Sequence, residues 1–134
     1  MTTISRTIVA TGNLKNLVRA LQKAGIIESL SGKVPFTVFA PSDEAFAKFS
    51  PETIELILKD KERLNTIVRA HIASGMMTSS NLVKIKKMKS INGKELMIST
   101  TKGLCIQDAK IIKPDITCDN GIIHIVDNVM FLKK

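Results

Sequence analysis

The chain has 134 residues, 44% of them hydrophobic, and a formal net charge of +8 at pH 7. A chain of this length suits one domain, residues 1–134, whose apolar core needs no metal or disulfide. It has no Trp and no Tyr, so it lacks the aromatic platforms on which many proteins stack single-stranded nucleic acid, and we expect no specific nucleic-acid partner. The excess of Lys and Arg favours anionic partners, although such a bias is also common in proteins without one.

The two cysteines and the N-terminal residues do not decide in which cellular compartment the protein is located. Cys105 and Cys118 form no CxxC motif and have no nearby His, so we expect no zinc site and no redox motif. Geometry decides whether they pair, and free thiols are favoured over a disulfide. Residues 1–7 show no signal peptide, and no apolar run reaches membrane-spanning length. The protein therefore either stays inside the cell or has lost a leader.

The first predicted helices lie before residue 31. Residues 4–11 are mildly apolar, and Gly12 breaks their pattern. Asn13 is the expected cap of the next helix, and Gly25 is its expected stop. The apolar stripe of that helix has the i, i+3, i+4, i+7 spacing and consists of Leu14, Leu17, Val18 and Leu21.

Residues 36–49 (FTVFAPSDEAFAKF) carry four of the five Phe residues and predict a strand, a turn and a short helix. The β-branched and aromatic residues at the start favour a strand, which Pro41 ends because it has no N–H. Ser42 is the expected N-cap of the helix, and Asp43 and Glu44 lie in the first turn, where the helix dipole favours negative charge. We expect this unit to nucleate the core.

Residues 50–75 predict two further helices. Ser50 and Pro51 are typical of a helix start. A second apolar stripe ends at Ser74-Gly75 and consists of Leu64, Ile67, Val68, His71 and Ile72.

Residues 76–132 predict short strands separated by turns. Asn92-Gly93 is a strong hairpin signal, residues 101–103 form a second turn, and Pro114-Asp115 is expected to open a loop. The last strand is expected over residues 122–132. A helical half followed by a meander of strands predicts the α+β class.

Two stretches resemble the signature motifs of fasciclin domains. Residues 37–46 (TVFAPSDEAF) are similar to the first motif, and residues 121–130 (GIIHIVDNVM) are similar to the second. The resemblance implies an α+β domain in which a β-wedge or sandwich of short mixed strands has helices clustered on one side. It also implies structural roles for Thr37, Val38, Phe39, Ala40, Pro41, Ser42, Asp43, Ala45 and Phe46 in the first motif. The corresponding residues of the second motif are Gly121, Ile123, His124, Val126 and Asp127.

His71 is the most informative single residue. It lies three residues after Val68 and four after Ile67, so we expect a buried ring that bonds backbone groups. In fasciclin domains this place is similar to a Tyr-His pair, followed by a Pro-Gly-like turn, that has been linked to adhesion, including integrin contacts in animal members. Here Ala70 replaces the Tyr, and Ser74 begins a turn without Pro. We carry over the structural role of His71 and keep it, with Ser74, as a candidate interaction site.

The remaining polar residues of the motifs are expected to serve packing. His124 lies between isoleucines in a strand, which favours a partly buried ring with satisfied nitrogens. Asp127 and Asn128 are expected to bond local backbone. A triad of Ser42, His71 and Asp127 has no support beyond residue type. We expect no catalytic residue, no metal ligand and no cofactor.

The run Lys84, Lys86, Lys87 and Lys89 is the main alternative site. Four lysines within six residues could neutralise several phosphates or sulfates in a salt-sensitive way. A solvated edge strand, in which Lys discourages edge-to-edge pairing, is the favoured interpretation. The run has no Arg and no aromatic residue, which weakens nucleic acid more than acidic polysaccharide or lipid.

Function follows from the resemblance more than from any site. It implies a non-enzymatic interaction module that acts in cell-surface adhesion or matrix association through protein or glycan contacts. We expect the chain to be a monomer. The location that the resemblance implies is extracellular or at the cell surface. The alternative is electrostatic binding of anionic polysaccharide or membrane surface through the lysine run.

Overall fold

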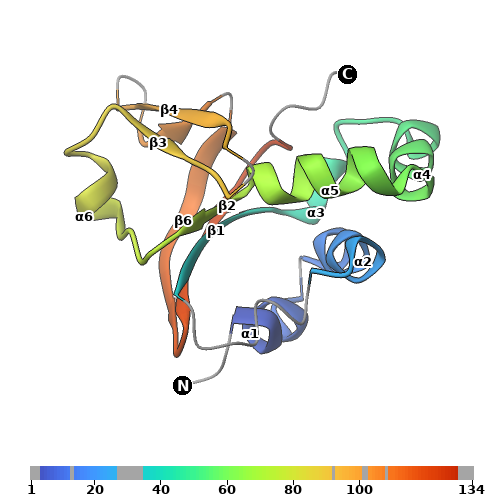
Figure 1. Cartoon of the computed structure of the whole chain (residues 1–134), viewed down its shortest axis with the longest axis horizontal. Coiled ribbons are helices and arrows are strands. Elements are labelled where there is room, and N and C mark those ends of the chain that lie inside the picture. The colour runs from blue at the N-terminus through green and yellow to red at the C-terminus, as the bar shows by residue number, and fades with distance from the viewer. Residues whose placement is uncertain are drawn as a thin grey trace.

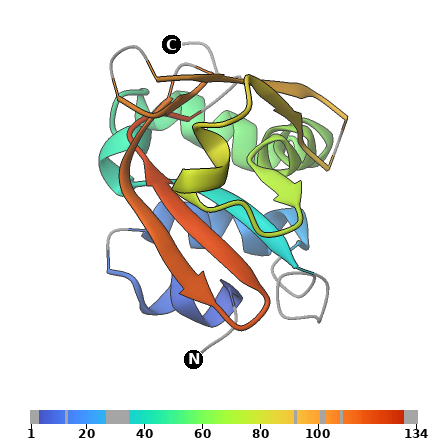
Figure 2. The same cartoon turned by 90° about the vertical axis from the view of Figure 1, so that its left-hand side faces the viewer.

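The computed structural model describes residues 4–12, 14–26, 35–91, 93–100, 103–107 and 109–129 (Figures 1 and 2). Its helices are α1 (Ile4–Ala10), α2 (Lys15–Ala24), α3 (Asp43–Phe46), α4 (Pro51–Lys59), α5 (Lys61–Ala70) and α6 (Ser79–Leu82). Its strands are β1 (Phe36–Pro41), β2 (Ile72–Ser74), β3 (Lys87–Lys89), β4 (Glu95–Ser99), β5 (Cys105–Ile106), β6 (Ala109–Cys118) and β7 (Gly121–Val126). A mainly helical half followed by strands confirms the predicted α+β class.

The two motifs lie side by side in the sheet. Strands β1 and β7 pair in parallel, from Phe36 opposite Gly121 to Pro41 opposite Val126. Strand β2 flanks β1 and strand β6 flanks β7, both antiparallel, and the strand order is β2-β1-β7-β6-β5-β4-β3. Every residue of β7 is buried, and its sequence is apolar except for His124, which is typical of a strand covered on both faces.

Two apolar cores lie on opposite sides of β1 and β7. The helices α1 to α5 gather on one side of these strands, and α6 lies on the other side (Figures 1 and 2). The first core includes Ile4, Leu21, Leu64, Ile72 and Ile123. The second core lies under the β3–β5 strands and includes Phe39, Leu82, Leu96, Ile106 and Val126. No helix among the described residues has the length and apolarity needed to cross a membrane.

Side-chain caps set several helix boundaries as predicted. Ser42 Oγ accepts the Ala45 N–H at 3.2 Å, and Ser50 Oγ accepts the Thr53 N–H at 3.2 Å. Gly25 ends α2 in the left-handed conformation, with φ of 73°. The start of α2 differs, because Leu14 occupies the N-cap position without a side-chain bond. The expected cap, Asn13, lies outside the described residues.

The acid that caps α2 comes from the first motif. Asn16 N–H, in the first turn of α2, donates to Asp43 Oδ1 at 2.9 Å. A carboxylate at a helix N-terminus satisfies an otherwise unpaired N–H and interacts favourably with the helix dipole. Asp43 therefore joins α3 to α2, which its position beside Ser42 in the sequence does not reveal.

The predicted stripe through Ile72 is wrong at its end. Helix α5 ends at Ala70, and Ile72 begins β2 opposite Val38. The His71 N–H bonds the Val68 carbonyl in a tightened last turn, and the following residues pair with β1 instead of continuing the helix. The apolar periodicity did not separate α5 from β2, because the side chains on both sides of the boundary are buried and the stripe continues across it.

The predicted loop at Pro114-Asp115 is also wrong, since β6 runs through both residues. The pairing of β6 with β7 shifts register between Ile111 and Lys113 and again between Lys113 and Ile116. Such bulges accommodate a residue that has no N–H for the ladder. The last strand ends at Val126, and Met130 to Leu132 lie outside the described residues.

Candidate interaction site

His71 lies at the C-terminal end of α5 and is buried, with 3% of its surface exposed. Its Nδ1 lies 2.7 Å from the Ile67 carbonyl oxygen, one helical turn back. This geometry agrees with the buried, backbone-bonded ring that its position in the stripe predicts. The side chain cannot contact a partner directly, so any contribution to an interaction passes through the fold around it.

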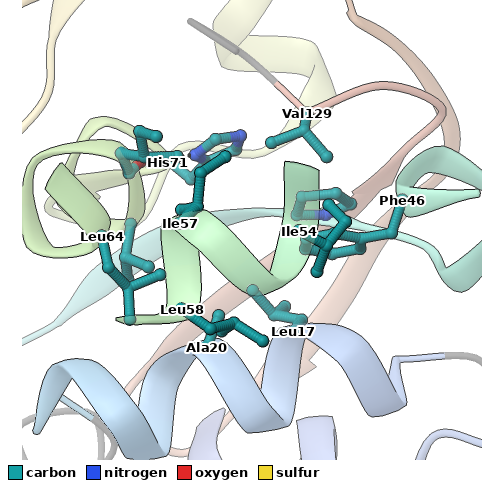
Figure 3. Close-up of a pocket in the computed structure, with 12 residues that line it drawn as sticks. Leu17, Ala20, Phe46, Ile54, Ile57, Leu58, Leu64, His71 and Val129 are labelled. Atoms are coloured by element: carbon teal, nitrogen blue, oxygen red, sulfur yellow. Dashed lines mark hydrogen bonds between the residues drawn. The ribbon is translucent and has the colours of Figure 1, made fainter. Parts of the chain in front are cut away.

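The imidazole of His71 borders a small apolar cavity of about 30 Å³ between α2, α4 and α5 (Figure 3). Leu17 and Ala20 reach it from α2, and the other side chains that line it are apolar except His71. With His71 as its one polar side chain, the lining offers no set of converging polar groups to a ligand. The hollow is a gap in the packing of the first core.

Ser74 lies at the exposed end of β2, and the turn that follows is held by the first motif. Thr37 Oγ1 donates to the Gly75 carbonyl at 2.7 Å and accepts the Met77 N–H at 2.8 Å. The hydroxyl of one buried Thr thus fixes both sides of the turn. Met76 lies in this turn, and 43% of its surface is exposed. Sequence reasoning missed this bridge, because Thr37 and Met77 are far apart in the chain.

His124 is fully buried on β7, and both ring nitrogens have backbone partners. Nδ1 accepts the Asp115 N–H at 3.1 Å, and Nε2 donates to the Met77 carbonyl at 2.7 Å. The ring stacks on Phe39 with centroids 5.8 Å apart. Burial lowers the pKa of His124, because desolvation disfavours the imidazolium, and the Met77 carbonyl and the Asp115 charge only partly oppose this. The ring is therefore a neutral structural link, more buried than predicted.

Asp115 extends that link to α6. Its φ of 59° is left-handed, a conformation that Asp tolerates better than most residues. Its carboxylate accepts both the N–H and the hydroxyl of Ser79. The Ser79 hydroxyl is the main reason why the pKa of Asp115 lies below its usual value. Asp115 was missed as a contact residue because the sequence places it in a loop.

The polar side chains of the imagined triad have separate structural partners. Ser42 caps α3, His71 bonds Ile67, and Asp127 Oδ1 accepts the Lys110 N–H at 2.8 Å. The prediction of local bonding is thus wrong for Asp127, which bonds a neighbouring strand. It agrees with Asn128, whose Oδ1 accepts the adjacent Val129 N–H at 3.0 Å.

The lysine run lies at the edge of the sheet, since β3 is the last strand in the order. Lys84, Lys86, Lys87 and Lys89 are all exposed. Met88 packs against the second core, so Lys87 and Lys89 point together to the outer face. Lys84 and Lys86 precede the strand. The run is therefore an edge strand together with the segment that leads into it, and register places only Lys87 and Lys89 on the outer face of the strand.

Both cysteines are free in the structure. Cys105 is half-buried on β5, and Cys118 is buried at the end of β6. Burial raises the pKa of the Cys118 thiol, whose Sγ donates to Thr7 Oγ1 at 3.4 Å. Across the described ranges, no three His, Cys, Asp or Glu side chains are grouped so that they could hold a metal ion.

Two relatives from Synechocystis sp. are similar to this chain. "Uncharacterized protein sll1735" is 36% identical over 132 residues, which cover 98% of this chain and 99% of that protein. "Protein sll1483" is 35% identical over 127 residues, covering 91% of this chain and 70% of that protein. A Sus scrofa "Transforming growth factor-beta-induced protein ig-h3" is 27% identical over 97% of this chain, which spans only 19% of that protein.

A solved structure of a FAS1 domain pair, from the insect cell adhesion molecule Fasciclin I, matches the fold. It superposes with a TM-score of 0.86 at 18% identity, covering 98% of this chain and 51% of that one. Fasciclin domains occur in cell adhesion and matrix proteins such as periostin and ig-h3. The family model for the fasciclin domain matches residues 12–132. Both signature motifs pair with each other in the sheet, as strands β1 and β7, and the chain belongs to the fasciclin domain family.

Proposed function

We propose that this protein is a non-enzymatic interaction module that acts at a cell surface or in an extracellular matrix through protein or glycan contacts. The adhesion and matrix proteins among its relatives support this class of function. Fold similarity alone would not carry it, because function resides in particular sites of a fold.

The observation that supports the proposal most is that the buried polar side chains form hydrogen bonds within the chain. Thr37, Ser42, His71 and His124 each bond groups within the chain. Among the described residues, no buried side-chain nitrogen or oxygen lacks a hydrogen-bond partner. A reaction centre normally keeps polar groups that converge on a pocket. The polar residues of the motifs instead hold backbone segments in place, which suits a scaffold that works through its surface.

The turn from Ser74 to Met76 is the contact surface that we propose. Ser74 is exposed, Met76 is 43% exposed, and the bonds from Thr37 hold the backbone of the turn. A rigid turn loses little conformational entropy when a partner binds. His71 lies at the end of α5 just before β2, so its packing supports the turn without touching the partner.

The test is binding of purified variants to the envelope fraction of the cells from which the sequence comes. Met76→Glu should weaken binding at least tenfold while leaving the melting temperature unchanged, because the side chain is exposed. Leu56→Glu is the matched control, since Leu56 is 68% exposed on α4, away from the turn. Equal loss in both variants, or no loss in either, would refute the turn as the contact surface.

His71→Ala separates structure from contact. The proposal predicts a lower melting temperature and a loss of binding that follows the loss of folded protein. If His71→Ala melted like wild type yet lost binding, the structural assignment of His71 would be wrong.

A further inference from the structure

Positive charge is concentrated in one part of the chain. Between residues 84 and 113 the sequence has eight lysines and two acids, so this stretch carries six of the eight net positive charges. The segment includes β3, β4 and β5 and the first half of β6. The strands that cover the second core are therefore also the basic part of the protein.

Strand register brings three of these lysines onto one face. Lys87 pairs with Met97, and Cys105 pairs with both Ser99 and Lys110. Paired residues point to the same side of a sheet, and alternate residues of a strand share a side. The opposite side packs on the second core through Met88, Leu96, Ile98, Ile106 and Ala109. The outer face therefore carries Lys87, Lys89, Met97 and Lys110, which we call the outer lysine face.

Among the described residues, the acids near this face do not neutralise it. Glu95 Oε1 lies 3.8 Å from Lys87 Nζ, with both side chains more than half exposed, and such pairs are weak. Asp127 is half-buried and accepts the backbone N–H of Lys110. Lys84, Lys86 and Lys94 add exposed positive charge along the edge.

Apolar side chains protrude among these lysines. Met97 is 52% exposed on β4 next to Lys87, and Ile112 is 51% exposed on β6, two residues after Lys110. Exposed lysines alone would fit any polyanion. A hydrated polysaccharide offers no apolar phase to a protruding methionine. At a lipid surface the same side chain can leave water for the boundary of the acyl chains, and this transfer is favourable.

We propose that the outer lysine face docks on an anionic lipid surface. The ammonium groups of Lys87, Lys89 and Lys110 lie against the lipid headgroups, and Met97 enters the interface between them. Each lysine near such a surface strengthens binding roughly fivefold, so the three together contribute on the order of a hundredfold. This docking is independent of the contact that we propose at the Ser74–Met76 turn.

The test is co-sedimentation with phosphatidylcholine vesicles that do or do not contain phosphatidylserine, at low and at physiological salt. Lys87→Gln, Lys89→Gln and Lys110→Gln are combined in one variant. A control variant combines Lys15→Gln, Lys48→Gln and Lys61→Gln, which also removes three exposed lysines but from the helical side. Met97→Ser, alone, removes the apolar contact. Soluble heparin competes as a polyanion without an apolar phase.

Docking on lipid predicts binding to the phosphatidylserine vesicles only. The outer-face triple variant should lose on the order of a hundredfold in affinity and the control triple variant less than about fivefold. Met97→Ser should weaken vesicle binding severalfold and leave heparin binding unchanged. The proposal is overturned if the phosphatidylserine vesicles are not bound, if both triple variants lose equally, or if Met97→Ser has no effect on vesicle binding.

Discussion

The Asp115 N–H donates to Nδ1 of His124 at 3.1 Å, across the irregular pairing of β6 with β7. Nδ1 is therefore an acceptor, and the proton of the neutral ring lies on Nε2, which donates to Met77. A second proton on Nδ1 would place two N–H groups against each other. The buried ring thus binds its two partners only while it is neutral.

This arrangement predicts that the protein loses stability in mild acid. Burial lowers the pKa of His124 in the folded state, whereas the unfolded chain titrates near the usual value of about 6.5. Below that value the unfolded state takes up the proton first, so the free energy of unfolding falls as pH falls towards the lowered folded pKa. Melting temperatures between pH 7.5 and pH 5 measure the loss.

The variant His124→Gln is the control for this pH dependence of stability. Gln does not titrate, so the variant should be less stable than wild type at pH 7 but should lose less on acidification over the same range. An equal pH dependence in wild type and variant would contradict the role given to His124. Asp115 acts in a lower window, because its folded pKa is depressed and its contribution disappears only as pH falls below about 3.8.

Gly121 is the glycine at which we expect one added methyl group to reduce stability most. A Cβ at this position would overlap the carbonyl oxygen of Phe36 and Cδ1 of Ile4, where β7 meets β1 and α1. The backbones of β1 and β7 cannot move apart here without breaking their parallel pairing. Gly121→Ala should therefore lower the free energy of unfolding by about 3 kcal/mol or more. Gly12→Ala is the control, since nothing lies within 4 Å of its Cβ. Denaturant unfolding at equal midpoints for both variants would refute the close approach.

Thr37→Val tests the bridge to the turn after β2. The substitution keeps the shape but leaves the Gly75 carbonyl and the Met77 N–H without the hydroxyl, which should cost about 1–3 kcal/mol. The Met77 amide should also exchange its hydrogen faster. Thr66→Val removes an exposed hydroxyl from α5 and should change stability by less than about 0.5 kcal/mol. Unchanged Met77 exchange in Thr37→Val would show that the hydroxyl does not hold the turn.

Filling the cavity beside His71 should stabilise the first core. Ala20→Val adds two methyl groups where space exists, and it should raise the free energy of unfolding by about 0.5–1 kcal/mol. Ala70→Val introduces the same atoms at a fully buried helix position that does not line the cavity, so it should cost about 1–3 kcal/mol. Chemical denaturation compares the two variants, and destabilisation of equal size in both would show that the cavity cannot accept a side chain.

Local sequence signals predicted the elements whose ends are fixed by their own residues. Ser42, Ser50 and Gly25 act within one helical turn, so their chemistry is visible in the sequence. The resemblance to fasciclin domains supplied the rest of the architecture. It also pointed to the two stretches that pair in parallel as β1 and β7.

Long-range contacts escaped the sequence analysis. Asp43 caps α2 from another helix, Thr37 bonds Met77, and Asp115 bonds Ser79, each across more than twenty residues of chain. Periodicity reports which side chains face a core, but it carries no record of which backbone group a polar side chain meets. The lysine run was likewise read as one unit, whereas pleating and register group Lys87 and Lys89 with the distant Lys110.

The central claim is that the protein binds a specific partner at the cell surface. Its most direct test is binding of the wild-type chain to the envelope fraction of its source cells across a salt titration. A specific contact should persist above about 0.5 M salt, where the Debye length is only a few ångströms and exposed charges are screened. Absence of binding at every salt concentration would contradict the claim. Binding that disappears steeply with salt would also contradict it and would leave only the outer lysine face.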